Sequence, residues 1–372
     1  MLTSLLGIRL ILLVGKTVPL PASYDMMAAL SSLEVTNDAE HGDGFQITFT
    51  LGKSNPANYD LLQGGRIDPP NRVIIGVLLG ASPEVLIDGI ITHHQFAPSN
   101  EPGKSTVTVT GKDVSIMLDL KQKNESYPNQ PDFVIAGRLI GKYAQYGLVP
   151  KIKPTADVPI IIQRLPRQYE TDLQFIRRMA ARNGYVFYIE PLTFGASTAY
   201  WGPENRLSIP QSALTMNMGQ ATNVKSIHFT QDALAPIGAE GSFIEPITKT
   251  SIPIPPLPSL RVPPLVPSPT QPMRIQVMRE AANKNPAQAA LTALAEATRA
   301  PDSVTGEGEL NTVRYGKVLR ARKIVGVRGV GFTYDGLYYV RRVSHRISRG
   351  QYEQKFTISR EGTGSLTPVL KK

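Results

Sequence analysis

The chain has 372 residues, a formal net charge of +10 and no cysteine. A single hydrophobic core rarely grows beyond about 250–300 residues, so this length predicts two or three domains. Hydrophobic residues make up 41% of the chain and charged residues 19%, which is a globular composition. The absence of cysteine excludes disulfides, thiolate catalysis and cysteine-built zinc or iron–sulfur sites.

The positive charge is concentrated at the C-terminal end. Residues 311–372 contain 14 Lys and Arg and three acidic residues. Residues 1–310 contain 26 Lys and Arg and 27 acidic residues. A local excess of this size indicates either a solvated basic face or a surface for nucleic acid or an acidic protein. Composition alone leaves both interpretations open.

The apolar segment near the N-terminus is too short to cross a membrane. It covers residues 5–15 and contains Arg9, whereas a spanning helix needs about 20 apolar residues. No positively charged region precedes it, which argues against a signal peptide. We therefore expect a buried strand at residues 8–14, no membrane segment, and assembly in the host cytoplasm.

Residues 1–118 are predicted to form a first β domain. Residues 44–51 alternate apolar and polar side chains, a pattern typical of a half-buried antiparallel strand. Strands separated by short Gly-, Pro- and Asn-containing turns favour a barrel or a sandwich. The other predicted strands are residues 32–36, 72–79, 84–93 and 106–110.

Residues 119–198 are predicted to form a small domain of mixed helix and strand. Residues 131–146 show helical periodicity. Thr171 and Gln174 have the spacing of a capping box, which begins a helix, and Asn183-Gly184 supplies its stop signal. An aromatic strand at residues 185–189 follows, and a β-branched run at residues 158–163 precedes this unit.

Residues 199–372 are predicted to form a second β domain with three further features. Residues 246–272 contain 10 Pro in 27 positions, so they cannot be a helix or a central strand and are expected to form an extended strap. Asn285-Pro286 begins a helix that reaches residue 300, and residues 302–309 are predicted to be a loop. The predicted strands are residues 222–230, 316–324, 326–330, 338–345 and 352–360.

No residue pattern of a known catalytic centre is present. Gly15-Lys16-Thr17 resembles the end of a phosphate-binding loop, but that motif needs Gly at position 10, where the chain has Leu. His93 and His94 are adjacent, so in a strand they point to opposite faces and cannot bind one metal. We therefore predict no catalytic residue, no metal, no cofactor and no enzymatic activity.

Arg and Tyr residues are interleaved in the C-terminal strands. In a nucleic-acid-binding protein they would contact phosphates and stack on bases. In an assembly protein they would form an interface rich in Arg and Tyr. The sequence does not decide between these readings. The candidate interface residues are Arg314, Tyr315, Arg320, Arg322, Tyr338, Tyr339, Arg341, Tyr352 and Phe356.

Two segments resemble one protein family. Residues 164–188 read RLPRQYETDLQFIRRMAARNGYVFY and resemble the E-x-D-x-x-F-(L/I)-x-R-(L/M)-A…G-(Y/F)-x-F segment of the late control protein D family. Residues 336–360 resemble the closing strands of that family, Y-x-V…V-x-H…G-Y-x-x-x-F-x-L-x-R. These proteins are the central hubs of contractile phage tails, and type VI secretion spike proteins share the hub portion.

The resemblance implies a mainly β fold with two tail-tube-like β-barrel domains and a small α+β insertion. It implies a homotrimeric baseplate hub in the virion that adapts a sixfold tail tube to a threefold central spike. Other baseplate proteins would be further partners, and the genome would pass through the lumen. We also expect strands near residues 72–79 and 318–324 in the inner sheet of the ring.

Two other functions stay open at this point. A basic β-barrel protein that binds nucleic acid would also account for the C-terminal charge. A tail-associated peptidoglycan hydrolase would need a pair of apposed carboxylates, which nothing in the sequence marks. Because only 12 residues follow Arg360, we expect the spike and any wall-degrading enzyme to be separate chains.

Overall fold

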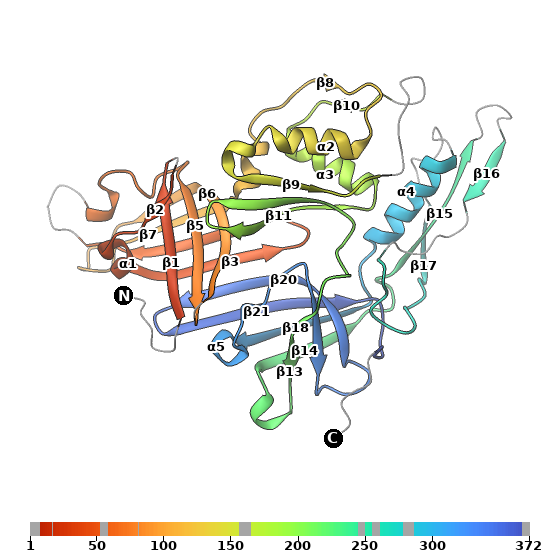
Figure 1. The fold of residues 1–372 in the computed structure, drawn as a ribbon. Coiled ribbons are helices and arrows are strands. Elements are labelled where there is room, and N and C mark those ends of the chain that lie inside the picture. Colours follow the sequence, from red (N-terminus) through yellow and green to blue (C-terminus); the bar gives the residue numbers. More distant parts are fainter. Residues whose placement is uncertain are drawn as a thin grey trace.

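The structure is a computed structural model that describes residues 8–16, 18–52, 59–80, 82–155, 165–244, 250–254, 261–277 and 286–366. It is mainly β with short helices, as the sequence predicts (Figure 1). In Figure 1 an N-terminal β unit lies at the left, an insertion unit at the top, a C-terminal β unit below and a protruding arm at the right. None of the helices in these ranges has the length and hydrophobicity that a membrane crossing requires.

The N-terminal β unit is one antiparallel sheet that wraps around its own core. Its strands follow the order β3-β4-β7-β6-β5-β1-β2. Leu33, Ile47 and Ile75 come from three of these strands and are buried in the same hydrophobic cluster. The elements are β1 (Ile8–Gly15), β2 (Leu20–Pro21), α1 (Tyr24–Ala29), β3 (Leu30–Asp38), β4 (Gly44–Thr50), η1 (Asp60–Leu62), β5 (Arg72–Leu79), β6 (Ser82–Ala97) and β7 (Thr106–Asp113).

The near-continuous apolar sequence of β5 follows from burial on both faces. Val73, Ile75 and Val77 point into the core of the N-terminal β unit. The alternate positions face the insertion unit, where the Phe194 ring lies 3.1 Å from the Cβ position of Gly76. A strand covered on both faces loses the polar alternation of a half-exposed strand.

The insertion unit contains two helices and a three-stranded sheet in the order β11-β12-β9. The predicted helix at residues 131–146 divides into α2 and η3, and Gly147 follows with a φ of 79°. The predicted run at residues 158–163 lies outside the described residues. The elements are η2 (Val114–Leu118), β8 (Glu125–Ser126), α2 (Asp132–Gly141), η3 (Ala144–Tyr146), β9 (Leu148–Ile152), β10 (Arg167–Gln168), α3 (Asp172–Arg182), β11 (Val186–Thr193) and β12 (Ala196–Gly202).

The residues of the first resembling segment shape the start of α3. The Thr171 hydroxyl accepts a hydrogen bond from the Gln174 backbone N–H at 3.3 Å, as the capping box predicts. Asp172 is fully buried and accepts hydrogen bonds from the Gln168 amide and the Tyr143 hydroxyl, both at 2.8 Å. This part of the motif therefore fixes a helix start and its packing.

The C-terminal β unit differs from the prediction at two places. Residues 302–309, predicted to be a loop, are largely strand β18, and most of residues 316–324, predicted to be a strand, form an irregular segment after α5. Gly316 and Arg322 have φ values of 75° and 63°, which a β-strand does not accommodate. The elements are β13 (Gln211–Thr215), η4 (Gly219–Ala221), β14 (Val224–Gln231), β18 (Val304–Asn311), α5 (Thr312–Tyr315), β19 (Ile324–Arg328), β20 (Gly336–Ser348) and β21 (Gln351–Arg360).

The arm is a small sheet with one helix, which the sequence did not predict as a unit. Its strands β15 (Ile237–Ile244), β16 (Ser251–Ile254) and β17 (Arg274–Val277) follow the order β16-β15-β17, and α4 (Pro286–Arg299) packs on β15. The Pro-rich stretch contributes the edge strand β16 and then crosses the body. Leu265, in that crossing segment, is buried against Ile324 and Tyr339.

The two β units share one sheet. β20 pairs with β3 from Arg342↔Asp38 to Ser348↔Ser32, which joins the N-terminal and C-terminal strands. The result is a run of eight strands in the order β14-β18-β21-β20-β3-β4-β7-β6. Every neighbouring pair in this run is antiparallel.

Candidate assembly surface and the junctions that support it

One face of the eight-stranded run is polar, and we call it the polar sheet face. Side chains on this face lie opposite each other in register across neighbouring strands. Arg346 of β20 pairs with Glu34 of β3 at 3.5 Å, and His228 of β14 lies 3.4 Å from Glu307 of β18. Cross-strand pairs of opposite charge stabilise a sheet modestly, and they prevent a net positive or negative potential from building up on its surface.

The formal charges on the polar sheet face balance. Lys225 illustrates this, since its ammonium group lies 3.2 Å from Glu309 and also pairs with Glu353. Such a face is hydrated without attracting a polyanion strongly. Its cations are Lys112, Lys225, Arg342, Arg346 and Lys355, and its anions are Glu34, Asp38, Glu307, Glu309 and Glu353.

The eight-stranded run ends in two open edges. Within the described residues, β14 has β18 as its single strand neighbour. At the other end, β6 pairs with β5 only as far as Ile90, while its pairing with β7 continues to Ala97. Among the described residues, no strand pairs with residues 92–97 on the side away from β7. Open strand edges of this length are templates for pairing with another chain.

Arg322 joins three units at one buried point. Its guanidinium group donates to the Asp43 carboxylate at 3.1 Å and to the Asp38 carbonyl at 2.6 Å, both in the N-terminal β unit. It also donates to the Ile189 carbonyl at 3.3 Å and lies over the Tyr188 ring at 4.5 Å, both in the insertion unit. Burial disfavours the cation, but the charge of Asp43 outweighs this and raises the pKa of Arg322.

A second buried junction is the arginine–carboxylate cluster. Arg341 of β20 donates to Asp302 at 2.7 Å and to Glu204 at 2.5 Å, and Arg261 of the strap donates to Asp302 at 2.6 Å. Burial alone would raise the pKa of Asp302, but the nearby guanidinium groups lower it. The cluster ties together the linker after β12, the Pro-rich strap, the start of β18 and the end of β21. Its members are Arg206, Arg261, Arg341, Glu204, Asp302 and Glu361.

Most of the predicted interface residues make contacts within the chain. Arg320 donates to the Val85 carbonyl at 2.6 Å and pairs with Glu84, and Arg341 belongs to the arginine–carboxylate cluster. Arg314 is exposed. This corrects the expectation that the whole set faces a partner, because side chains buried in one chain cannot reach another. The buried ones are Tyr315, Arg322, Tyr338, Tyr339, Tyr352 and Phe356.

Six of the 12 Lys and Arg side chains that the structure describes after residue 310 pair with acids elsewhere in the fold. Arg322 pairs with Asp43, Lys323 lies 3.4 Å from Glu190, and Arg346 lies 3.5 Å from Glu34. Each acid comes from the first 310 residues. About half of the uneven charge distribution in the described residues therefore reflects ion pairing within the fold.

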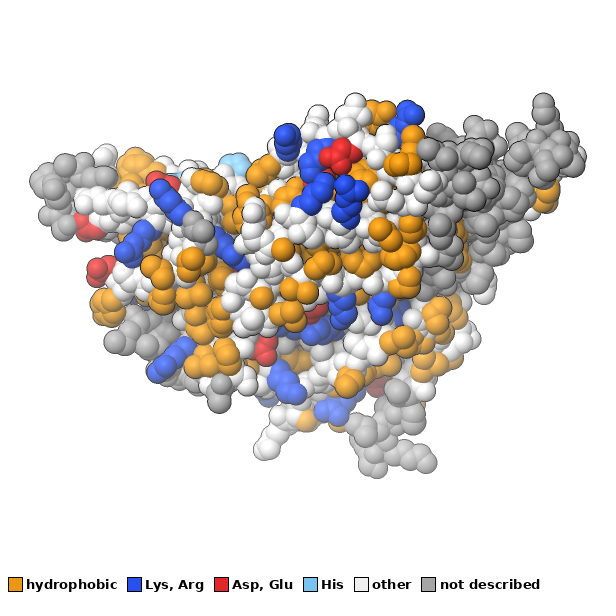
Figure 2. Space-filling model, turned by 45° about the horizontal axis from the view of Figure 1, so that its top comes forward, with side chains coloured by type: hydrophobic (Ala, Val, Ile, Leu, Met, Phe, Trp, Pro, Cys, Tyr) orange, Lys and Arg blue, Asp and Glu red, His pale blue; other side chains and the backbone are white. Residues whose placement is uncertain are grey.

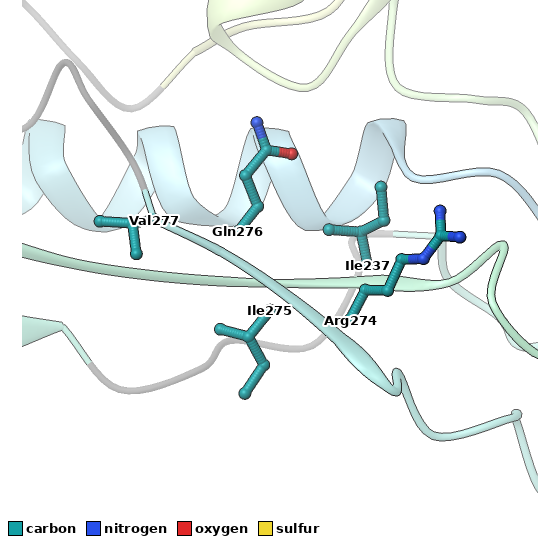
Figure 3. Close-up of a pocket in the computed structure, with 5 residues that line it drawn as sticks. All are labelled: Ile237, Arg274, Ile275, Gln276 and Val277. Carbon is teal, nitrogen blue, oxygen red and sulfur yellow. The ribbon is translucent and has the colours of Figure 1, made fainter.

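The described residues contain no group of three or more His, Asp or Glu side chains that could hold a metal ion. A shallow pocket of about 580 Å³ lies on the arm, between β15 and β17. Figure 3 shows Gln276 and Ile237 on the side of the neighbouring helix and Ile275 on the opposite side. The five described residues that line this pocket include no acid, histidine or hydroxyl group, and they offer no acid–base chemistry.

No family model and no curated protein matches this chain. Solved structures do match. A tail protein from Neisseria meningitidis is 15% identical over 95% of this chain and 97% of its own, with a TM-score of 0.64. The 43 kDa tail protein of prophage MuSo2 from Shewanella oneidensis is 15% identical over 95% of this chain and 98% of its own, with a TM-score of 0.64.

A third match is a component of the type VI secretion system of E. coli, described as structurally similar to two tail proteins of bacteriophage T4. It is 12% identical over 92% of this chain and 77% of its own, with a TM-score of 0.56. At these identities the matches establish a shared fold, which is the fold that the two resembling segments predicted.

Proposed function

We propose that this chain is a structural subunit of the baseplate hub of a contractile phage tail or a related injection particle. Three copies form a closed ring that adapts a sixfold tail tube to a threefold central spike. The fold shared with two tail proteins, one of them from a prophage, and with a type VI secretion component supports this proposal. The protein would then reside in the baseplate of the virion, beside tube, spike and other baseplate proteins.

The eight-stranded run with two open edges carries this proposal. Because the run has an even number of antiparallel strands, its first and last strands, β14 and β6, are antiparallel to each other. Residues 92–97 of one copy can therefore pair with β14 of the next copy and continue the same antiparallel alternation. A head-to-tail contact of this kind closes into a ring and covers both edges.

Each copy contributes two β units to such a ring, so three copies offer six to the tube. The polar sheet face would line the lumen. Its balanced charges suit the passage of a polyanionic genome, since a strongly basic wall would hold the phosphates.

The two strands that the sequence predicted for the inner sheet lie elsewhere. The 72–79 strand, β5, lies in the shared sheet but outside the eight-stranded run, and residues 318–323 are not a strand. We therefore assign the lumen wall to the eight-stranded run.

Cysteine scanning tests the ring, because the chain has no native cysteine. His228 of β14 and Gln95 of β6 both point to the polar sheet face, where Gln95 lies opposite Thr108. The double variant His228→Cys/Gln95→Cys should form disulfide-linked trimers on non-reducing gels. Further double variants, with each cysteine moved along its strand, test the other possible registers between β14 and β6. Each single variant is the matched control and should not form them.

Light scattering behind a sizing column gives the native mass in parallel. A mass near three times 40.6 kDa that persists at high salt is the expected result. A monomer at every concentration, together with no cross-linking across the whole set of cysteine pairs, would overturn the proposed ring.

A further inference from the structure

Exposed apolar side chains are common on this protein, so exposure alone marks no site. Figure 2 shows hydrophobic side chains scattered over the N-terminal β unit and the insertion unit, among charged and other groups. An apolar side chain is more informative beside an open strand edge, because pairing of that edge with another chain would bury it. Both ends of the eight-stranded run carry such side chains, on the face opposite the polar sheet face.

At the β6 end this side chain is Phe96. It lies opposite Val107, which is fully buried in the core of the N-terminal β unit, so both point away from the polar sheet face. The Phe96 ring is 39% exposed and meets the Tyr59 ring edge to face, with 5.1 Å between the ring centroids. The Tyr59 hydroxyl lies 3.0 Å from the Ser105 hydroxyl, which holds the aromatic pair in place. The core of the N-terminal β unit therefore ends here in a partly exposed aromatic pair.

At the β14 end these side chains are Ile227 and Phe229. They lie opposite Gly308 and Gly306 of β18, and both are half-buried against the core of the C-terminal β unit. The Phe229 ring stacks on the Tyr334 ring at 4.9 Å and lies 2.8 Å from the Cβ position of Gly306. This packing fixes the ring in place, which reduces the entropy lost on binding. The core of the C-terminal β unit therefore also ends in partly exposed apolar groups at an open edge.

We infer that Phe96 of one copy packs against Ile227 and Phe229 of the next copy, so that the cores of two neighbouring subunits join behind the paired strands. The inference rests on the proposed ring, since it needs β6 and β14 to pair. A second copy is the occupant because the two edges complement each other, and one head-to-tail contact covers both of them. The contact contains no formal charge, as in the apolar centre of a stable interface.

The geometry of antiparallel pairing brings these side chains together. If residues 92–97 pair with residues 226–231 of the next copy, Phe96 lies opposite Ile227. Registers that keep the polar side chains of both strands on one face differ by two residues. A shift of two residues toward the end of β14 places Phe96 opposite Phe229. Phe96 therefore meets an apolar side chain in both of these registers.

Analytical ultracentrifugation of the full-length protein over a range of concentrations tests this inference. Phe96→Ser should raise the concentration at which half of the chains are trimeric about tenfold, which corresponds to about 1.4 kcal/mol. Phe96→Leu keeps an apolar side chain and should lose much less. Ile227→Ser is the reciprocal variant on the other edge and should also weaken the trimer. Far-UV circular dichroism establishes that each variant is folded before the comparison.

The matched control is Tyr169→Ser, which removes an aromatic ring that is 62% exposed and lies on neither β6 nor β14. This control should assemble as the original protein does. Trimers of Phe96→Ser and Ile227→Ser as stable as those of the original protein would overturn the inference and leave the proposed ring intact. Equal losses in Phe96→Ser and Tyr169→Ser would also count against it, because they would show no preference for the edges. A monomer at every concentration, with no cross-linking between cysteine pairs, would overturn the ring and this inference together and would leave both edges to a different protein.

Discussion

Arg322 and Asp43 lie 279 residues apart in the sequence and form a buried ion pair between the two β units. The same guanidinium group reaches the Ile189 carbonyl of the insertion unit. One side chain therefore bonds all three units, and its φ of 63° holds it in an irregular segment between α5 and β19. The relative placement of the units depends on this contact as well as on the β3–β20 pairing.

Replacing Arg322 by Met should destabilise the chain by about 3–5 kcal/mol, because it leaves the buried Asp43 carboxylate without its cation. The measurement is the free energy of unfolding in urea. Arg314→Met is the matched control, since Arg314 is exposed, and its effect should stay within about 0.5 kcal/mol. The double variant Asp43→Asn/Arg322→Met should recover part of the loss. A loss below 1 kcal/mol in the single variant would show that the pair does not hold the units together.

The arginine–carboxylate cluster predicts a loss of stability in acid. The guanidinium groups lower the pKa of Asp302 in the folded state below its value in the unfolded chain. The stability contributed by Asp302 is therefore present above the ordinary carboxyl pKa and is lost as the pH falls below it. The variant Asp302→Asn should be less stable at neutral pH and should show a weaker acid dependence. An unchanged acid dependence in urea melts between pH 5 and 2 would contradict this.

The sequence predicted the elements whose signals are local. β1 and β5, with their apolar runs, and β21 lie within one or two residues of the predicted bounds, and α3 begins at the predicted capping box. The fold class followed from the spacing of such strands and from the two resembling segments. These features depend on neighbours along the chain, which a sequence displays directly.

The features that the sequence did not reveal depend on contacts between distant residues. Gly306 and Gly308 suggested a loop, but they lie in β18, where the rings of Phe229 and Phe356 occupy the space above them. The C-terminal cations suggested an exposed patch, yet six of those described pair with acids from the first 310 residues.

His345 predicts a second pH effect with a different origin. It is fully buried beside Tyr352 and Asn37, and burial lowers its pKa to about 3. The unfolded chain therefore binds a proton at His345 below about pH 6.5, while the folded chain stays neutral there. Between pH 6 and 4 this group should lower the stability by up to about 1.4 kcal/mol per pH unit. His345→Gln should reduce that slope in urea melts.

Exposed histidine supplies the control for that experiment. His41→Gln is the matched substitution, since it alters a side chain that is 82% exposed. Equal slopes for His345→Gln and the original protein would show that His345 is protonated in the folded state. In that case its contacts with Tyr352 and Asn37 would have to tolerate an imidazolium ion.

The glycines of β18 give a prediction about packing. A Cβ at Gly308 would lie 2.5 Å from both the Phe356 ring and the Ser226 carbonyl oxygen, and backbone cannot move aside as a flexible side chain does. Gly308→Ala should therefore destabilise the chain by about 1–3 kcal/mol through overpacking. Gly141→Ala is the control, since Gly141 ends α2 with no atom within 4 Å of its Cβ position. That substitution should be neutral or stabilise by up to about 1 kcal/mol. The measurement is the melting temperature of the two variants. Similar melting temperatures would show that the strands around β18 shift to accommodate the added methyl group.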